Sequence, residues 1–298
     1  MLAEQSRVVV VTRVWRRMQP VLRDLWFRDI GQRGKVIYMR VFQVDSFTDE
    51  LFKGNPAGVC MFVSKESDRW MQNMAGEMNL SETAFLREVK EGYELRWFTP
   101  ATEVDLCGHA TLAAAHALWE TGELDVDQEA KFFTKSGVLK ATKMGDWVQL
   151  DFPLEEDEPV HPPQELVDGL KAPFTYVGKN RMDYIVEVES EAILRQLRPD
   201  KDALCKLANR GIIVTCKSER DKFDFISRFF APALGIDEDP VTGSAHCCLG
   251  PYWKRKLKED EFVAYQASER GGILKLRVDD RVYIRGQART VFGGEVRL

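Results

Sequence analysis

Long apolar runs are missing from this chain of 298 residues. No stretch approaches the roughly 20 apolar residues that a membrane-spanning helix needs. The sequence also lacks the G-x-G-x-x-G and P-loop motifs of nucleotide binding, a lysine in a recognisable Schiff-base setting, and the cysteine or histidine spacings of a metal site. These absences argue against a membrane protein and against nucleotide, Schiff-base or metal chemistry. We therefore expect neither a cofactor nor a metal.

Positive charge is not in excess, because 42 lysines and arginines face 47 acids and the net charge is -5. We therefore expect neither nucleic acid nor an anionic membrane surface as a partner. The six cysteines show no paired spacing, and a chain of this length does not need disulfides to build a core. We interpret them as reduced thiols of an intracellular protein: Cys60, Cys107, Cys205, Cys216, Cys247 and Cys248.

Residues 1–37 differ in composition from the rest of the chain. They are rich in arginine and poor in acids, and their apolar run VVVVTRVWRRM is too short and too interrupted for a signal peptide. Arginine-rich, acid-poor leaders can be organellar transit peptides, but this one has little serine. We expect a disordered leader ahead of a cytoplasmic fold that starts near Tyr38.

The acidic, proline-rich stretch FPLEEDEPVHPP is typical of a linker and divides the chain into residues 38–152 and 153–298. The two halves share a repeat. RWFTPA (residues 96–101) recurs as RFFAPA (residues 228–233), and each copy precedes Gly-His-Ala or Gly-Ser-Ala and an apolar stretch of small residues. This pattern predicts an internal duplication of strand, loop and a helix that starts at the glycine. It leaves open whether the last strands return to the first half.

The first of these helices, HATLAAAHALW, is apolar on nearly every face, which is typical of a helix buried on all sides. We predict an α+β fold of two similar halves, each a curled sheet around a central helix, with the two helix N-termini facing each other across a cleft. The expected strands contain VFQVDSF, AGVCMFV, YELRWF, WVQLDF, RGIIVTC, DFISRFF, GILKLRV and RVYIRG.

The entrance of the second helix, IDEDPVTGSAH, is rich in polar residues. A helix N-terminus binds anions through unpaired backbone N–H groups and a partial positive charge. Asp239, Thr242 and Ser244 are placed to hold such a ligand, or to cap the helix, as these residue types often do. The first entrance, residues 107–109 (CGH), has different polar groups. Two unlike entrances favour an asymmetric substrate held between them.

Glu82, in NLSETAFL, has two interpretations. Asn79-x-x-Glu82 fits a capping box, in which the carboxylate would be structural. The alternation in TAFLREV is typical of a strand, which would leave Glu82 at a strand edge, free to act as an acid or base. His109 is either a core histidine or a site residue. A zinc site that combines Cys107, His109 and His246 with the vicinal cysteines matches no known ligand spacing.

Four motifs resemble the PhzF family of phenazine biosynthesis-like proteins, and its eukaryotic branch in particular. They are FKGNPAGVCMF, EMNLSETAFL, RWFTPATEVDLCGHATLAAAHAL and FAPALGIDEDPVTGSAHCCLGPYW. The likeness covers Tyr38 to Leu298 and excludes the leader. It implies the diaminopimelate-epimerase-like fold, with the active site between two similar halves.

In the founding enzyme of that family a glutamate moves a proton within a cyclic hydroxy-amino acid. The resemblance implies the same catalytic role for Glu82, supported by His109, Asp239 and Ser244. It also implies a set of substrate-binding residues at the cleft: Asn55, Gly108, Thr242 and Gly243.

We therefore expect a cofactor-independent isomerase that acts on a small carboxylate by one-base proton transfer. Two alternatives stay open: an amino-acid racemase or epimerase of the same superfold that uses two thiols, and a binding protein that kept the fold without activity. The racemase would need a cysteine at each helix entrance, and here Cys107 stands at the first and Thr242 at the second. By analogy with the family we also expect a homodimer.

Overall fold

Both helices that follow the repeat form where the sequence predicts them. Helix α3 (Gly108–Glu120) begins at the first glycine and α7 (Gly243–Leu257) at the second. The computed structural model of the chain describes residues 38–62 and 66–297, and Met39–Val296 form one compact unit. The predicted leader, residues 1–37, lies outside the described residues.

The remaining elements of the first half are β1 (Tyr38–Ser46), β2 (Asn55–Phe62), α2 (Asp68–Met78), β3 (Glu82–Val89), β4 (Gly92–Phe98), β5 (Glu103–Val104), β6 (Ala130–Thr134), β7 (Gly137–Met144) and β8 (Trp147–Phe152). Those of the second half are β9 (Glu158–Pro159), α4 (Gln164–Leu170), β10 (Tyr176–Lys179), β11 (Asp183–Glu187), α5 (Glu191–Gln196), α6 (Lys201–Leu204), β12 (Gly211–Lys217), β13 (Phe225–Ala231), η2 (Pro232–Leu234), β14 (Ile236–Asp239), β15 (Glu261–Gln266), β16 (Gly272–Val278), β17 (Val282–Gly286) and β18 (Ala288–Arg297).

The two halves pair their strands in the same order. In the first half β1 and β2 are antiparallel, β2 and β3 parallel, β3 and β4 antiparallel, β4 and β6 parallel, and β6, β7 and β8 antiparallel. The series β10, β11, β12, β13, β15, β16 and β17 repeats these pairings one for one. The duplication predicted from six residues therefore extends through the whole strand order of each half.

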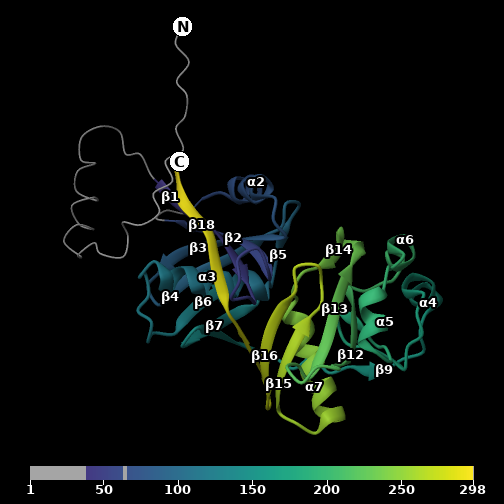
Figure 1. Ribbon diagram of the computed structural model, residues 1–298. Coiled ribbons are helices and arrows are strands. Elements are labelled where there is room, and N and C mark those ends of the chain that lie inside the picture. Colours follow the sequence, from purple (N-terminus) through teal and green to yellow (C-terminus); the bar gives the residue numbers. More distant parts are fainter. Residues whose placement is uncertain (1–37, 63–65, 298) are drawn as a thin grey trace, which may run out of the picture. The chain divides into compact units, whose positions relative to one another are not determined.

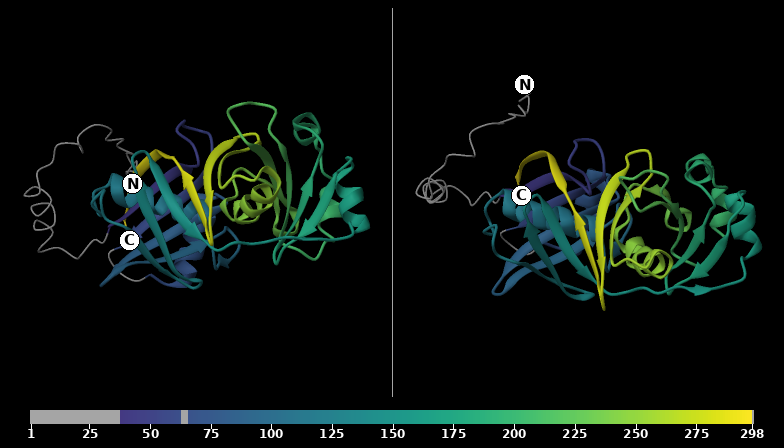
Figure 2. Two further views of the ribbon diagram at one scale, coloured as in Figure 1. Left: turned by 90° about the horizontal axis from the view of Figure 1, so that it is seen from below. Right: turned by 60° about the horizontal axis from the view of Figure 1, so that its bottom comes forward.

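Helix α3 is buried on all its faces, as its composition predicts. Only His116 and Glu120 on it are not buried. Its alanines bring the surrounding strands close to the helix axis, since their side chains occupy little space. Helix α7 is buried without interruption from Ala245 to Trp253, and the views in Figures 1 and 2 show strands of the second half enclosing it.

One hydrophobic core includes residues of both central helices. It contains Trp97 of β4 and Trp253 of α7, both almost fully buried, with Leu112 of α3 among them. Two smaller clusters lie elsewhere, one involving α4, α5 and α6 and the other α2. Because α3 and α7 share a core, their N-termini are held in a fixed relation, which matters for the site that follows.

The halves are connected by more than the linker. Strand β8 of the first half pairs antiparallel with β17, so that Phe152 lies opposite Val282, and β18 pairs with β1. Within residues 153–163 the chain forms β9 and pairs it with β10. The division of the chain after residue 152 stays a prediction.

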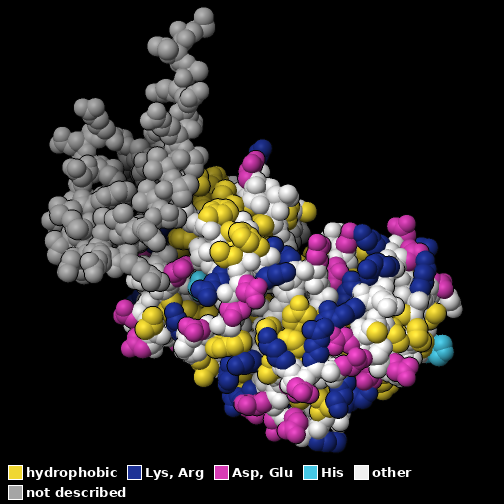
Figure 3. All heavy atoms as spheres, viewed as in Figure 1, with side chains coloured by type: hydrophobic (Ala, Val, Ile, Leu, Met, Phe, Trp, Pro, Cys, Tyr) yellow, Lys and Arg dark blue, Asp and Glu magenta, His cyan; other side chains and the backbone are white. Residues whose placement is uncertain are grey.

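Charged side chains of both signs are interspersed over the described residues on the face shown in Figure 3. Among the described residues, no helix combines the length and apolar character needed to cross a membrane.

Candidate active site

The N-termini of α3 and α7 meet inside the compact unit. A methyl group placed on Gly108 would lie 3.6 Å from Cα of Gly243 and 3.9 Å from the backbone nitrogen of Ser244. Within the described part of the chain, the N-cap residues Cys107 and Thr242 make no side-chain capping hydrogen bond. The N-terminal ends of both helices therefore converge, and the backbone N–H groups at their glycines together favour an anion.

Glu82 is the first residue of β3, beside Ala57 of the parallel strand β2. The capping-box interpretation is wrong, because Asn79 ends α2 in the left-handed conformation. The Glu82 side chain is 14% exposed, and its Oε2 lies 3.3 Å from Nε2 of His109. Among the described residues this oxygen has no hydrogen-bond partner. An unpaired, buried carboxyl oxygen is costly to maintain, which makes it a candidate functional group.

Burial, and after it the nearby negative charge of Asp239, raise the pKa of Glu82 to about 7. Hydrogen bonding by Ser81 and Cys107 acts in the opposite direction. At neutral pH both protonation states of Glu82 are therefore populated. This is the condition under which one carboxyl group can both accept and return a proton.

His109, the second residue of α3, is buried and belongs to this polar cluster. Burial lowers its pKa to about 3, so the imidazole is neutral. Its Nδ1 lies 3.2 Å from Nδ2 of Asn55 and 3.5 Å from the Cys107 sulfur. Its Nε2 faces Oε2 of Glu82, 3.3 Å away, and the Ser81 hydroxyl, 3.4 Å away.

Asn55, at the start of β2, connects the two helix entrances. Its Nδ2 donates to Oδ1 of Asp239 at 2.8 Å and to the Val241 carbonyl at 2.9 Å, and its Oδ1 accepts from Ser81 at 3.3 Å. Both partners of Nδ2 can only accept, so the orientation of the amide is determined by its neighbours. Asn55 is fully buried, and its amide ties His109 of the first half to Asp239 of the second.

Asp239 and Thr242 bond to each other and not to the helix backbone. The Thr242 hydroxyl donates to Oδ2 of Asp239, so neither side chain caps α7. Gln266 holds this pair from β15, since its Oε1 accepts from the Thr242 backbone nitrogen and its Nε2 donates to the Asp239 carbonyl, each at 2.8 Å. Burial raises the pKa of Asp239 to about 6.

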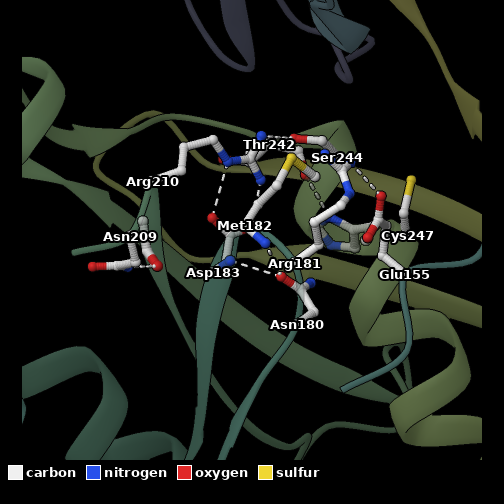
Figure 4. Close-up of polar contacts among 12 residues, drawn as sticks. Glu155, Asn180, Arg181, Met182, Asp183, Asn209, Arg210, Thr242, Ser244 and Cys247 are labelled. Atoms are coloured by element: carbon white, nitrogen blue, oxygen red, sulfur yellow. Dashed lines mark hydrogen bonds and ion pairs between the residues drawn. The ribbon is translucent and has the colours of Figure 1, made fainter. Parts of the chain in front are cut away.

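Ser244, in the first turn of α7, is contacted from another direction. Its Oγ accepts from the guanidinium of Arg210 at 2.8 Å, and that guanidinium forms an ion pair with Asp183 (Figure 4). Asp183 begins β11 and Arg210 precedes β12, and the two strands run parallel beside each other. The structure thus brings together Glu82, His109, Asn55, Asp239, Thr242, Ser244 and both glycines.

Four polar residues of this cluster are not among the site residues that the sequence predicts: Ser81, Asp183, Arg210 and Gln266. Ser81 directly precedes Glu82, so its position in NLSETAFL was an available signal. The other three lie at strand ends far from any motif. Only the pairing of strands brings them to the helix entrances.

One set of side chains near the entrances has the geometry to hold a metal ion. The ligand atoms of Glu82, Cys107 and His109 all lie within 4.8 Å of one another, a mixed oxygen, sulfur and nitrogen set. Burial raises the pKa of the Cys107 thiol well above its usual range, so metal binding there would have to displace a firmly held proton. The set does not include His246, whose Nδ1 donates to the Thr242 carbonyl at 2.8 Å.

Comparison with known proteins identifies relatives along nearly the whole described chain. The family model described as "Phenazine biosynthesis-like protein" (PhzC-PhzF) matches residues 44–294. An uncharacterized isomerase of Halalkalibacterium halodurans is 56% identical over 261 residues, which are 87% of this chain and 98% of that protein. The human phenazine biosynthesis-like domain-containing protein is 39% identical over 287 residues, covering 85% and 97% of the two chains.

Solved structures agree with this similarity. A PhzF-family protein from Enterococcus faecalis superposes with a TM-score of 0.82 at 41% identity, over 88% of this chain and 100% of that chain. A hydroxyproline epimerase from Agrobacterium vitis, 11% identical with a TM-score of 0.58 over 90% and 94% of the two chains, shares the fold alone. The chain therefore belongs to the phenazine biosynthesis-like (PhzC-PhzF) family, and it is an isomerase, as its curated bacterial relatives are named.

Proposed function

We propose that this isomerase moves a proton between carbon atoms of a small carboxylate-containing metabolite, with Glu82 as its single base. The observation that carries the proposal concerns Glu82: its Oε2 is buried 3.3 Å from Nε2 of His109 with no hydrogen-bond partner among the described residues, and the pKa of Glu82 is about 7. A general base works best when its pKa lies close to the pH at which it operates.

In the proposed reaction the Glu82 carboxylate removes a proton from a substrate carbon. The C–H bond breaks, an O–H bond forms on Glu82, and the electron pair spreads into the unsaturated system that ends at the substrate's carbonyl or carboxylate. The Glu82 acid then gives the same proton to a second carbon on the same face. This transfer balances without an oxidant, a reductant or a metal, because no electron leaves the substrate.

The neighbouring groups support these steps. The backbone N–H groups at Gly108 and Gly243, with Ser244, would bind the substrate carboxylate and stabilise the charge that develops as the proton leaves. His109 presents Nε2 to Glu82, and the Asn55 amide lies beside the other ring nitrogen. Asp239 raises the pKa of Glu82 by its charge, and Thr242 holds Asp239 in place.

An amino-acid racemase of the same superfold is the second candidate, supported by the fold that the chain shares with the structures of a hydroxyproline epimerase and of a protein described as a probable proline racemase. Against it stands the asymmetry of the two entrances, since Thr242 occupies the N-cap position that Cys107 has in the other half. A threonine hydroxyl is too weak an acid or base to replace a thiol.

The test is a screen for carbon-bound proton exchange. Small carboxylic acids, singly and in metabolite extracts, are incubated in heavy water with the wild-type chain, with Glu82→Gln and with Glu88→Gln. Glu88 is a matched control because it is an exposed glutamate on the same strand. Deuterium should enter a substrate with the wild type and with Glu88→Gln, but not with Glu82→Gln. Full exchange by Glu82→Gln would overturn the assignment of the base.

The homodimer stays a proposal, made by analogy with the family. Light scattering at micromolar concentration tests it, and a mass of one chain would contradict it.

A further inference from the structure

The Ser244 hydroxyl is bonded to the guanidinium group of Arg210, which can only donate hydrogen bonds. Arg210 donates through a terminal nitrogen to Ser244 Oγ at 2.8 Å, and a guanidinium has only donors. The Ser244 oxygen is therefore committed as an acceptor on that side. Its own proton must point elsewhere.

The guanidinium is fixed on its other edge. Its Nε donates to Oδ1 of Asp183 at 2.9 Å and a terminal nitrogen bonds Oδ2, which gives the two-pronged pairing that planar guanidinium and carboxylate groups favour. The Asp183 side chain is 1% exposed and that of Arg210 28%. The Phe229 ring lies 5.4 Å from the guanidinium carbon. Arg210 thus has little freedom to release Ser244.

The backbone around this pair is anchored as well. The Arg210 backbone nitrogen donates to the Met182 carbonyl at 2.8 Å. Asn180 accepts at its Oδ1 from the backbone nitrogens of Met182 and Asp183. In Figure 4 the Arg210 side chain extends toward Ser244, with Asp183 on its lower side. Two strands of the second half therefore aim the guanidinium at the first turn of α7.

The Ser244 proton has no partner in the part of the chain that the structure describes. Within residues 38–62 and 66–297, the bond from Arg210 is the only hydrogen bond of the Ser244 side chain, and in it Ser244 accepts. Ser244 is half-buried beside Gly243, where the two helix entrances meet. A hydroxyl that accepts from a cation and has a free proton is a strong donor toward whatever fills that place.

We propose that Arg210 is a positioning residue that makes Ser244 an obligatory hydrogen-bond donor, so that the substrate must present an oxygen acceptor to it. The inference rests on the proposed function and adds a rule of specificity. Helix N–H groups and the Ser244 O–H group are all donors. A carboxylate, with two acceptor oxygens, satisfies them, whereas a carboxamide would turn an N–H group against one of them.

The test compares two probes of the same shape, benzoate and benzamide, whose binding is measured by saturation-transfer NMR. Wild-type chain should prefer benzoate by about tenfold or more, the range that one hydrogen bond involving a charged group supplies. In Arg210→Met the Ser244 oxygen becomes free to accept from the amide, and the preference should fall by about tenfold. Arg210→Lys, which keeps a cationic donor, should retain part of it.

Two controls separate positioning from folding. Arg181→Met removes a neighbouring arginine, 69% exposed and paired with Glu155, and should leave the preference unchanged. Arg210→Met also leaves Asp183 buried without its partner, so the double variant Asp183→Asn/Arg210→Met provides a form in which no buried charge is unpaired. The melting temperature of this double variant should lie close to that of the wild type, and its preference for benzoate should be reduced as in Arg210→Met.

The decisive comparison uses Ser244→Ala. In that background Arg210→Met should have no further effect on the ratio of the two affinities, because the residue through which Arg210 acts is gone. An equal effect of Arg210→Met with and without Ser244, or a wild-type chain that shows no benzoate preference up to the solubility of the probes, would overturn the inference. Glu82→Gln should bind both probes as the wild type does. If Glu82 is not the base, the deuterium-exchange experiment shows it. If this inference is wrong, the preference for benzoate shows it, so the two failures are distinguishable.

Discussion

The side-chain amide of Asn55 donates to Oδ1 of Asp239 at 2.8 Å, across 184 positions of sequence. The same nitrogen lies 3.2 Å from Nδ1 of His109. One buried amide thereby contacts both the imidazole beside Glu82 and the carboxyl group whose charge raises the Glu82 pKa. The two halves of the site are thus connected by a single side chain.

Replacing Asn55 should weaken the fold and the site together. Asn55→Ala removes the donor from Oδ1 of Asp239, which remains buried, and the loss of a hydrogen bond to a charged group should lower the free energy of unfolding by about 2 kcal/mol at neutral pH. Denaturant titration of Asn55→Ala, Asp239→Asn and the double variant gives the coupling between the two residues. We expect the double variant to be more stable than additivity predicts, by about 1 kcal/mol. Strictly additive losses would contradict the pairing.

The raised pKa of Glu82 predicts a pH-dependent stability. Its pKa in the folded chain, about 7, lies above its ordinary value of 4.5, so folding favours the protonated acid. The folded state is therefore penalised progressively as pH rises between these two values. Glu82→Gln removes the penalty, and its stability relative to the wild type should be about 2 kcal/mol greater at pH about 8 than at pH about 5.

Denaturant unfolding at the two pH values measures this difference. Glu88→Gln, exposed on the same strand, serves as the control and should change equally at both. A pH-independent effect of Glu82→Gln would mean that Glu82 titrates as an ordinary surface carboxylate.

Gly108→Ala should separate stability from activity. The added methyl group would make ordinary contacts at 3.6 Å with Gly243 and Phe152, so the free energy of unfolding should change by less than about 1 kcal/mol. The same methyl group would occupy the place where the helix entrances meet, and benzoate binding and proton exchange should fall by about tenfold or more.

The matched control for this variant is Gly76→Ala. Gly76 lies in α2, where an added methyl group would meet nothing within 4 Å, so the variant should gain up to about 1 kcal/mol and keep full activity. Full activity in Gly108→Ala as well would show that the substrate does not approach this backbone.

The sequence predicted the fold well because the fold repeats. RWFTPA and RFFAPA lie in or directly after β4 and β13, and each of these strands is followed by the helix that the glycine begins. The short strands β5 and β14 were not predicted. Glu103–Val104 and Ile236–Asp239 carry too few apolar residues for a periodic pattern, and they are strands only because β4 and β13 lie beside them.

The site was predictable only in part. Glu82, His109, Asp239 and Ser244 stand in motifs, but the resemblance and not the pattern selected them among possible caps. Arg210 and Gln266 act through side-chain bonds that span 34 and 24 positions, and nothing in their local sequence distinguishes them from other arginines and glutamines. Such contacts depend on which strands pair, and these pairings join segments that lie far apart in the sequence.

The last prediction concerns Cys107 and separates the isomerase from the racemase. Its sulfur lies 3.5 Å from Nδ1 of His109, close enough to the proposed base to be taken for a catalytic group. Burial raises its pKa well above the usual range, so it is a thiol and not a thiolate at neutral pH. Thr242, at the equivalent position of α7, offers a hydroxyl already bonded to Asp239.

Exchange of protons between two opposed thiols is therefore not available at these entrances, and one-base transfer by Glu82 makes Cys107 dispensable. Cys107→Ala should keep at least about half of the wild-type proton-exchange rate, since it removes only a weak contact to His109 and a hydrogen bond to Glu82 that is the smallest of the influences on the Glu82 pKa. Alkylation should inhibit the wild type by blocking the entrance and leave Cys107→Ala unaffected, with Cys205→Ala, an exposed cysteine, as the control. If Cys107→Ala loses all turnover while Glu82→Gln retains it, and the substrate proves to be an amino acid that is racemised, the thiol is the base and the one-base isomerase is wrong.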